Sequence, residues 1–137
     1  MQNDSYIEWD DEIYSLGITK LDEQHKQLVA LINALHQNIG SSDRKFIEKI
    51  LNTLVQYTQN HFSDEEKILE KTNYNSTEKH KAQHKTFVRR IKTFSQKFQD
   101  DPDSSELIES ILPFLRDWLM THILVQDMDY KKYLLGE

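Results

Sequence analysis

Histidines occupy positions in this chain where a helical bundle would place its core. Five of the six histidines fall on the apolar stripes of four predicted helices: His25, His61, His80, His84 and His122. One histidine on such a stripe is usually a hydrogen-bonded core residue, but five together would bury nitrogens that neutral imidazoles cannot satisfy for one another. A metal ion would bind all of them at once, so the pattern predicts a metal site.

Two of these histidines have a potential fellow ligand one helical turn away. His61 and Glu65 are four residues apart, and so are His80 and His84. Residues with that spacing lie about 40° apart on one helix face, because an α-helix turns about 100° per residue. Either pair alone could arise by chance, but two pairs on neighbouring helices indicate a shared metal-binding region.

The last carboxylate of the pattern stands in THILVQD, residues 121–127. Asp127 follows His122 by five residues, which in a regular helix turns it about 140° away. A solvated charge at a helix end, or a C-terminal cap, is the usual role of such a residue. A regular period places His122 and Val125 on the inward stripe, and Asp127, Tyr130 and Leu134 continue a stripe displaced from it by one residue. We therefore predict that Asp127 is a ligand and that the backbone leaves the regular helix after His122, through a π-bulge or a helix end.

The chemistry of these seven side chains restricts the metal. The chain has no cysteine, which excludes thiolate ligands, and imidazole with carboxylate suits iron, manganese, zinc or copper. Seven ligands exceed the four that a tetrahedral zinc ion takes. Two carboxylate-bridged ions of near-octahedral geometry account for all seven, which favours iron or manganese.

Amphipathic segments separated by short polar breaks must bring these ligands together. The apolar periodicity predicts helices over residues 19–38, 43–71, 77–99 and 104–126. Pro113, inside the last segment, predicts a kink or a later helix start. The expected fold class is all-α: an up-down-up-down four-helix bundle over residues 19–137, with residues 1–18 laid over it as an N-terminal arm.

The composition bounds the remaining possibilities. A length of 137 residues with 3 glycines and 2 prolines favours one helical domain over a sandwich or barrel. The net charge of −6 argues against nucleic acid as the main partner, and no apolar run approaches the ~18 residues of a membrane span. The acidic start MQNDSYIEWDDE is unlike a signal peptide. Together with the lack of cysteine, these features lead us to expect a cytoplasmic protein, monomeric or weakly oligomeric, without a membrane partner.

The motifs that carry the ligands resemble those of the bacterial hemerythrins, single-domain non-haem di-iron proteins that bind dioxygen. The resemblance runs through LGITKLDEQHKQL (16–28), YTQNHFSDEEKIL (57–69), HKAQHKTF (80–87) and WLMTHILVQD (118–127). It implies that one iron is bound by three histidines and the other by two, with two carboxylates and an oxo or hydroxo group as bridges. The residues so assigned are His80, His84 and His122 for one iron, His25 and His61 for the other, and Glu65 and Asp127 for the bridges.

The resemblance also implies where a small ligand would bind. The three-histidine iron would have three nitrogens, two carboxylate oxygens and the bridge, which fill six positions. The other iron would have one nitrogen fewer, so dioxygen would enter beside His25 and His61. Leu28, Trp118 and Leu119 lie three or four residues from ligands and are expected to wall this pocket, Leu119 above all; plain core packing is the alternative.

The expected function is therefore reversible dioxygen binding, for storage, delivery or sensing, in a protein that is not an enzyme. The alternative is a di-iron enzyme on the same scaffold, of the peroxidase or nitric oxide reductase type. Ligating imidazoles also need hydrogen-bond partners for their second nitrogen, and Thr58, Gln59 and Gln83 are near enough in sequence to be candidates. His36, about three turns from His25, is expected at the end of the bundle and outside the site.

Overall fold

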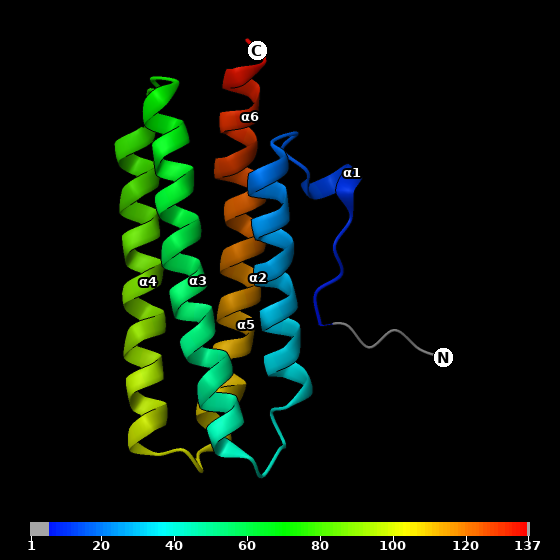
Figure 1. The fold of residues 1–137 in the computed structure, drawn as a ribbon, viewed down its shortest axis with the longest axis vertical. Helices are drawn as coiled ribbons and strands as arrows, with labels where there is room; N and C mark the ends of the chain where they lie inside the picture. Colours follow the sequence, from blue (N-terminus) through cyan, green and yellow to red (C-terminus); the bar gives the residue numbers. More distant parts are fainter. Residues whose placement is uncertain (1–5, 137) are drawn as a thin grey trace.

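Long antiparallel helices make up the body of the protein in the computed structural model, which describes residues 6–136 (Figure 1). Helices α2, α3 and α4 are followed by a last helix in three parts, and α2 packs against both α3 and α5, as α4 does. No strand occurs among the described residues. The predicted all-α, up-down-up-down bundle is confirmed, with these bounds: α2 (Thr19–Gln37), α3 (Arg44–Lys71), α4 (Thr77–Asp100), α5 (Ser105–Thr121), η1 (His122–Asp127) and α6 (Met128–Leu134).

The last helix differs from its prediction at its far end. It begins at Ser105, close to the predicted start, so Pro113 lies inside α5 and does not delay it. Instead of ending near residue 126, it continues through the π-helical segment η1 into α6 (Figure 1). The residues that follow Asp127 are therefore part of the bundle wall, and Tyr130 is buried.

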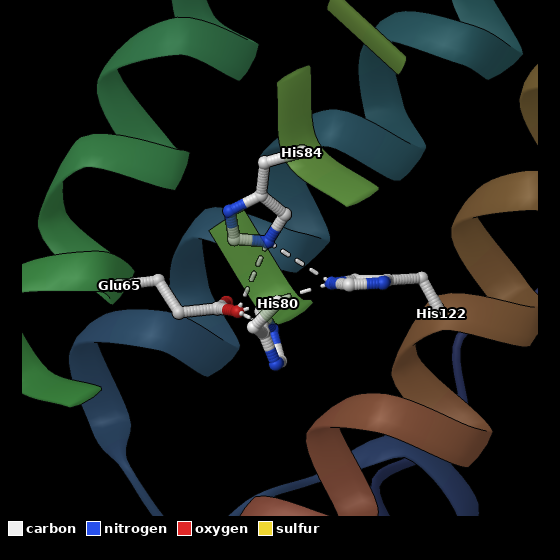
Figure 2. Close-up of side chains that lie close together, drawn as sticks. All are labelled: Glu65, His80, His84 and His122. Carbon is white, nitrogen blue, oxygen red and sulfur yellow. Dashed lines mark hydrogen bonds and ion pairs between the residues drawn. The ribbon is translucent and has the colours of Figure 1, made fainter. Parts of the chain in front are cut away.

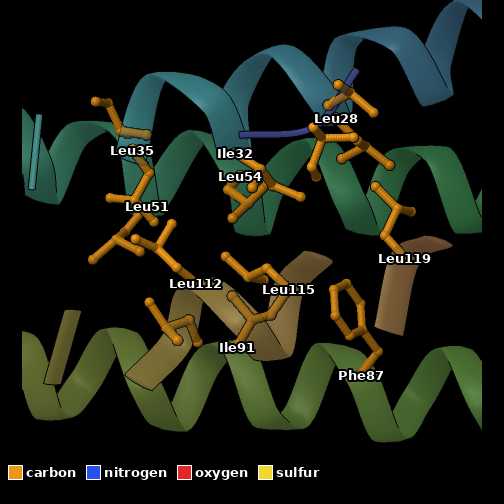
Figure 3. Packing of buried hydrophobic residues seen from close by; sticks show 14 of the residues in the cluster. Leu28, Ile32, Leu35, Leu51, Leu54, Phe87, Ile91, Leu112, Leu115 and Leu119 are labelled. Carbon is orange, nitrogen blue, oxygen red and sulfur yellow. The ribbon is translucent and has the colours of Figure 1, made fainter. Parts of the chain in front are cut away.

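The apolar core fills the half of the bundle nearest the α2–α3 and α4–α5 connections. Leucine and isoleucine side chains from the long helices meet there in one cluster, which Figure 3 shows from close by. Leu35, Leu51 and Leu115 are completely shielded from solvent. Burying side chains of this size stabilises a fold by roughly 1.5–3 kcal/mol each before the entropy cost. This half holds the helices in register, so the other half can accommodate polar groups.

Residues 6–18 run along the outside of the bundle as an arm with a short helix, α1 (Asp11–Tyr14). The backbone of Ile7 exchanges two hydrogen bonds with the Asn33 side chain, at 2.7 and 2.9 Å. Asp22 accepts a hydrogen bond from the Leu16 backbone N–H at 2.7 Å. Residues 1–5 of the predicted arm, and residue 137, lie outside the described residues, and the domain division at residue 18 stays a prediction.

The opposite end of the bundle is closed by tyrosines, which we call the tyrosine latch: Tyr74, Tyr130 and Tyr133. The Tyr74 hydroxyl donates to Asp129, and Tyr130 shares a 2.7 Å hydrogen bond with the Thr72 hydroxyl. The Tyr133 hydroxyl donates to the Thr72 carbonyl at 2.8 Å. The latch thus ties the α3–α4 turn to α6. Within residues 6–136, no helix is long and apolar enough to cross a membrane.

Candidate metal centre

The seven predicted ligands meet at one buried place between the helices. They come from α2, α3, α4 and η1, and each of them is at most 3% exposed: His25, His61, Glu65, His80, His84, His122 and Asp127. Figure 2 shows how Glu65 of α3, His80 and His84 of α4 and His122 of η1 converge. Burial of this many polar side chains in one place is costly unless each finds a partner.

Three histidines gather around one oxygen of Glu65. The Glu65 Oε1 atom lies 2.5 Å from His80 Nε2 and 3.3 Å from His84 Nε2. The His84 and His122 Nε2 atoms are 3.0 Å apart (Figure 2). The nitrogens and the oxygen thus form a group that could hold one metal ion.

The second Glu65 oxygen faces the other two histidines. Glu65 Oε2 lies 3.4 Å from His61 Nε2 and 3.8 Å from His25 Nε2. Asp127 divides its oxygens in the same way, with Oδ1 2.9 Å from His80 Nε2 and Oδ2 3.3 Å from His25 Nε2. Each carboxylate therefore presents one oxygen to each histidine group, which is the arrangement of a ligand that bridges two ions.

The π-helix explains how Asp127 reaches the site. Hydrogen bonds in such a segment run between residues five apart. Five residues therefore make little more than one turn, whereas in an α-helix they make almost one and a half turns. His122 and Asp127 consequently face the same side, and both are buried. Of the two departures from regular helix that the sequence left open, the structure contains the π-helical one. Val125, placed on the inward stripe by a regular period, is instead 55% exposed.

Deletion of Val125 is expected to leave the centre intact. Removing one residue turns the five-residue spacing of His122 and the aspartate into four, which in a regular α-helix again places both on one face. The variant should retain the metal content of the wild type and, relieved of the π-turn, unfold at an equal or higher temperature. Metal analysis and calorimetry check both, with Val125→Ala as the matched substitution. Loss of metal from the deletion variant alone would show that the site needs the π-turn itself.

The surrounding histidines control the charge on the two carboxylates. Burial by itself would raise the pKa of Glu65, but the histidine nitrogens around the carboxylate, those of His122 and His61 foremost, hold it well below the usual range. Burial and the charge of Glu65 act to raise the pKa of Asp127, and His122 and His25 outweigh them and lower it. Both side chains are thus ionised at neutral pH, as metal-bridging carboxylates must be.

The carboxylates in turn make protons and metal ions compete for the same nitrogens. Burial lowers the pKa of His80, but the carboxylates of Asp127 and Glu65, 2.9 and 2.5 Å from its Nε2 atom, raise it to about 9. The pKa of His25 is also raised, against the effect of burial, by the Asp127 carboxylate 3.3 Å from its Nε2 atom. Metal binding at neutral pH must therefore displace protons, and acid weakens it.

The polar atoms left without partners fit a pair of cations. His25 Nε2, His61 Nε2, one oxygen of Glu65 and both oxygens of Asp127 are buried, and none has a hydrogen-bond partner within residues 6–136. Each such atom costs about 1–3 kcal/mol if it stays unsatisfied. Ligand atoms about 2.1 Å from an ion and at right angles to each other are about 3.0 Å apart, which is the separation of the His84 and His122 nitrogens. The donor set therefore suits two ions of the iron or manganese class.

Comparison with known proteins agrees with this geometry. A family model described as the Hemerythrin HHE cation binding domain matches residues 16–134. The chain belongs to the hemerythrin family. Bacteriohemerythrin of Pseudomonas paraeruginosa is 32% identical over 92% of this chain and 80% of its own length. The hemerythrin-like protein of Naegleria gruberi is 33% identical over 95% of each chain.

The fold of solved hemerythrins matches as well. A structure of wild-type hemerythrin superposes with a TM-score of 0.82 at 28% identity and covers 92% of this chain and 95% of that one. The bacteriohemerythrin of Clostridium acetobutylicum, 31% identical, is covered over 96% of its length. The family expected from the motifs is thereby confirmed, together with its helical-bundle fold.

Hydrogen bonds to the second imidazole nitrogens come from residues that the sequence analysis did not name. His61 Nδ1 lies 2.7 Å from Gln24 Oε1, and His84 Nδ1 lies 2.9 Å from Glu66 Oε2. The expected candidates do not take this role: Thr58 and Gln83 each have a buried oxygen without a partner within residues 6–136. The sequence gives one indication of these two residues, because each is next to a predicted ligand: Gln24 directly precedes His25, and Glu66 directly follows Glu65.

Loss of the Gln24 amide is expected to weaken metal binding without unfolding the hemerythrin bundle. The Gln24 amide nitrogen donates to Asp64 at 2.8 Å, so its oxygen is held towards His61 Nδ1 and fixes which ring nitrogen carries the proton. Changes to such partners typically cost 10–100-fold in metal affinity. Gln24→Ala should show a loss of that order in a competition assay against a chelator. The control Gln56→Ala removes an exposed glutamine of α3; an equal loss there would refute a specific role for Gln24.

The three expected pocket residues lie in different surroundings. Leu28 and Leu119 are buried in the apolar cluster beside the site. Trp118 stacks on His122, with ring centroids 4.5 Å apart, and so lies next to the three-histidine group. Phe62, which no sequence pattern indicated, lies with its ring flat on the His84 imidazole, with 3.7 Å between the ring centroids. His36 stacks on Tyr6 in the N-terminal arm and lies outside the cluster of ligands.

Proposed function

We propose that this hemerythrin-family protein binds dioxygen reversibly at a pair of iron ions. The observation that carries the proposal is the split of each carboxylate, one oxygen towards three histidines and the other towards two. The ligands of one ion would be His80, His84 and His122, those of the other His25 and His61, and Glu65 and Asp127 would bridge them. Held by these seven residues, a pair of ferrous ions with an oxo or hydroxo group would supply the two electrons that reversible dioxygen binding requires.

The unequal number of histidines indicates which of the two ions would bind a small ligand. With one nitrogen fewer, the side of His25 and His61 is where a small ligand would bind. Leu28, one turn after His25, and Leu119, one turn before His122, would line that space, and both are almost completely buried. Apolar walls keep water and protons away from the bound gas, which favours release over oxidation chemistry. Trp118 would cover the three-histidine side, where it stacks on His122.

Reversible change in the optical spectrum tests the proposal. The iron-loaded, reduced protein should develop a charge-transfer band when dioxygen is added and lose it when dioxygen is removed, over repeated cycles. His36→Ala, which removes the histidine outside the ligand cluster, should behave like the wild type, whereas His61→Ala should not cycle.

Three outcomes would contradict the proposal. They are irreversible oxidation on first exposure, a metal content far below two ions per chain, and turnover of hydrogen peroxide or nitric oxide in place of a cycling band. The last of these would make the protein a di-iron enzyme.

A further inference from the structure

A groove between α3 and α4 reaches one of the proposed iron ligands from the protein surface. It has a volume of about 450 Å³, and His84 and Phe62 are among its lining residues. The Phe62 ring lies parallel to the His84 imidazole, with 3.7 Å between their centroids. His84 therefore connects the groove to the ligand cluster in Figure 2 through a single side chain.

Positive charge lines one wall of this groove. Lys85, Arg89 and Lys92 follow one another at helical spacing along α4, and all three are exposed. None of them forms an ion pair with a residue in the described part of the chain. The acidic residue in the lining, Glu66, is engaged with His84. On a protein of net charge −6, this surface is locally basic and opposite in sign to the whole.

The grooves that reach two other proposed ligands, His122 and His80, lack this basic character. The groove at His122 is lined by one acidic residue, Asp117, and by no lysine or arginine that the structure describes. The groove at His80 is lined by one lysine, Lys79, and one aspartate, Asp129. Of these three grooves, the one at His84 has cationic side chains without a described ion-pair partner and also an aromatic ring, Phe62, that contacts a proposed ligand.

An oxygen-binding iron pair needs such an approach, and here the inference rests on the proposed function. When both ions have been oxidised to Fe³⁺, binding of dioxygen stops until they are reduced. Each ion must gain one electron, so two one-electron carriers are oxidised for every centre restored, and no bond within the chain is made or broken. The chain has no cysteine, so thiols of its own cannot supply these electrons.

We propose that the α3–α4 groove docks a small acidic protein that carries single electrons, of the ferredoxin type, and that electrons enter through Phe62 and His84. The cations of α4 would attract the acidic face of the carrier. Complementary charge raises association rates by 10–10³-fold, and the effect falls steeply with ionic strength. Docking at the groove would bring the redox centre of the carrier close to the three-histidine side of the iron pair.

Charge reversal in the groove provides the test, with an acidic plant-type [2Fe–2S] ferredoxin as the probe. The triple variant Lys85→Glu/Arg89→Glu/Lys92→Glu should be reduced by the ferredoxin at least about 10-fold more slowly than the wild type at low ionic strength. Reduction by dithionite, which needs no docking, should stay unchanged. The corresponding glutamine triple variant should show a smaller loss, and added salt should remove the difference between all forms.

A matched control carries the same charge change elsewhere. Lys45, Lys49 and Lys132 are exposed and lie outside the groove, so their reversal should slow reduction far less. Calorimetric titration with oxidised ferredoxin measures docking directly, and the groove variant should lose affinity that the control keeps. This affinity does not depend on dioxygen, so failure of the oxygen cycle alone leaves the docking result intact.

Two results would overturn the docking proposal. The first is equal ferredoxin reduction rates in the wild type and the groove variant. The second is binding of anionic lipid vesicles or nucleic acid through the same cations without any ferredoxin binding.

Discussion

Glu65→Gln is expected to destroy both halves of the metal centre and to destabilise the iron-free protein. The Glu65 carboxylate is within 4 Å of five histidine nitrogens, through one oxygen or the other. A neutral amide can neither bridge two cations nor balance the protonated histidines. Removing one partner from a buried charged network typically costs about 3–5 kcal/mol. Urea unfolding of the iron-free protein should show a loss of that size, and metal analysis should show no bound pair.

The same substitution should change how stability depends on pH. Because the folded pKa of His80 is raised to about 9, its protonation contributes stability that is fully present below the ordinary value of 6.5 and is lost as the pH rises through 9. In Glu65→Gln that loss should be smaller, with Asp127 still 2.9 Å from His80. The exposed neighbour variant Glu70→Gln serves as the control. An unaltered pH profile in Glu65→Gln would show that the carboxylate does not hold these protons.

Asp127→Ala is expected to prevent assembly of a two-iron centre while the bundle stays folded. Asp127 supplies one oxygen to each histidine group, and its loss should cost more than the 10–100-fold typical of an outer hydrogen-bond partner. Iron content should fall to one ion per chain or fewer. The iron-free variant should stay folded but unfold at a lower temperature than the wild type, because His25 and His80 lose a carboxylate partner and the lowered pKa of Asp127 shows that its charge is stabilised in the fold.

The control for this prediction is Asp117→Ala, which removes an exposed aspartate from the same continuous helix. It should bind as much iron as the wild type. Asp127→Asn separates size from charge, because the amide nearly preserves the shape but cannot act as an anionic bridge. Should Asp127→Ala retain two ions per chain, the bridging role would have to pass to another group.

The burial of the seven proposed ligands was predictable from the sequence, because an apolar stripe and the helical period together place a residue inside or outside the bundle. An apolar stripe fixes which face of a helix is inside, so a histidine on that stripe points into the bundle wherever the neighbouring helices lie. The capping aspartate of α3, Asp43, which accepts a hydrogen bond from the Phe46 N–H at 3.1 Å, marks a boundary for an equally local reason. Features of this kind need no knowledge of distant contacts.

Other features depended on contacts that no local pattern contains. The sequence indicated that Asp127 must turn inward, but a π-helix and a helix end would both have allowed this. The assumption of a regular helical period also placed Val125 inside the bundle, whereas it is exposed. Gln24 and Glu66 lie beside the apolar stripes, so their partners depend on the approach of a neighbouring helix: α2 brings Gln24 to His61, and α4 brings His84 to Glu66. Such pairings follow from helix packing.

The distribution of the ligands over α2, α3, α4 and η1 has a consequence for how iron would leave. No single helix holds either histidine group, so fraying of one helix end leaves the remaining ligands in place. An ion can escape only when helices separate, and separation also exposes the leucine core that lies along the same helices. Iron release would therefore be as slow as the opening of the whole bundle, and the lifetime of the loaded state would be set by unfolding kinetics and not by ligand exchange.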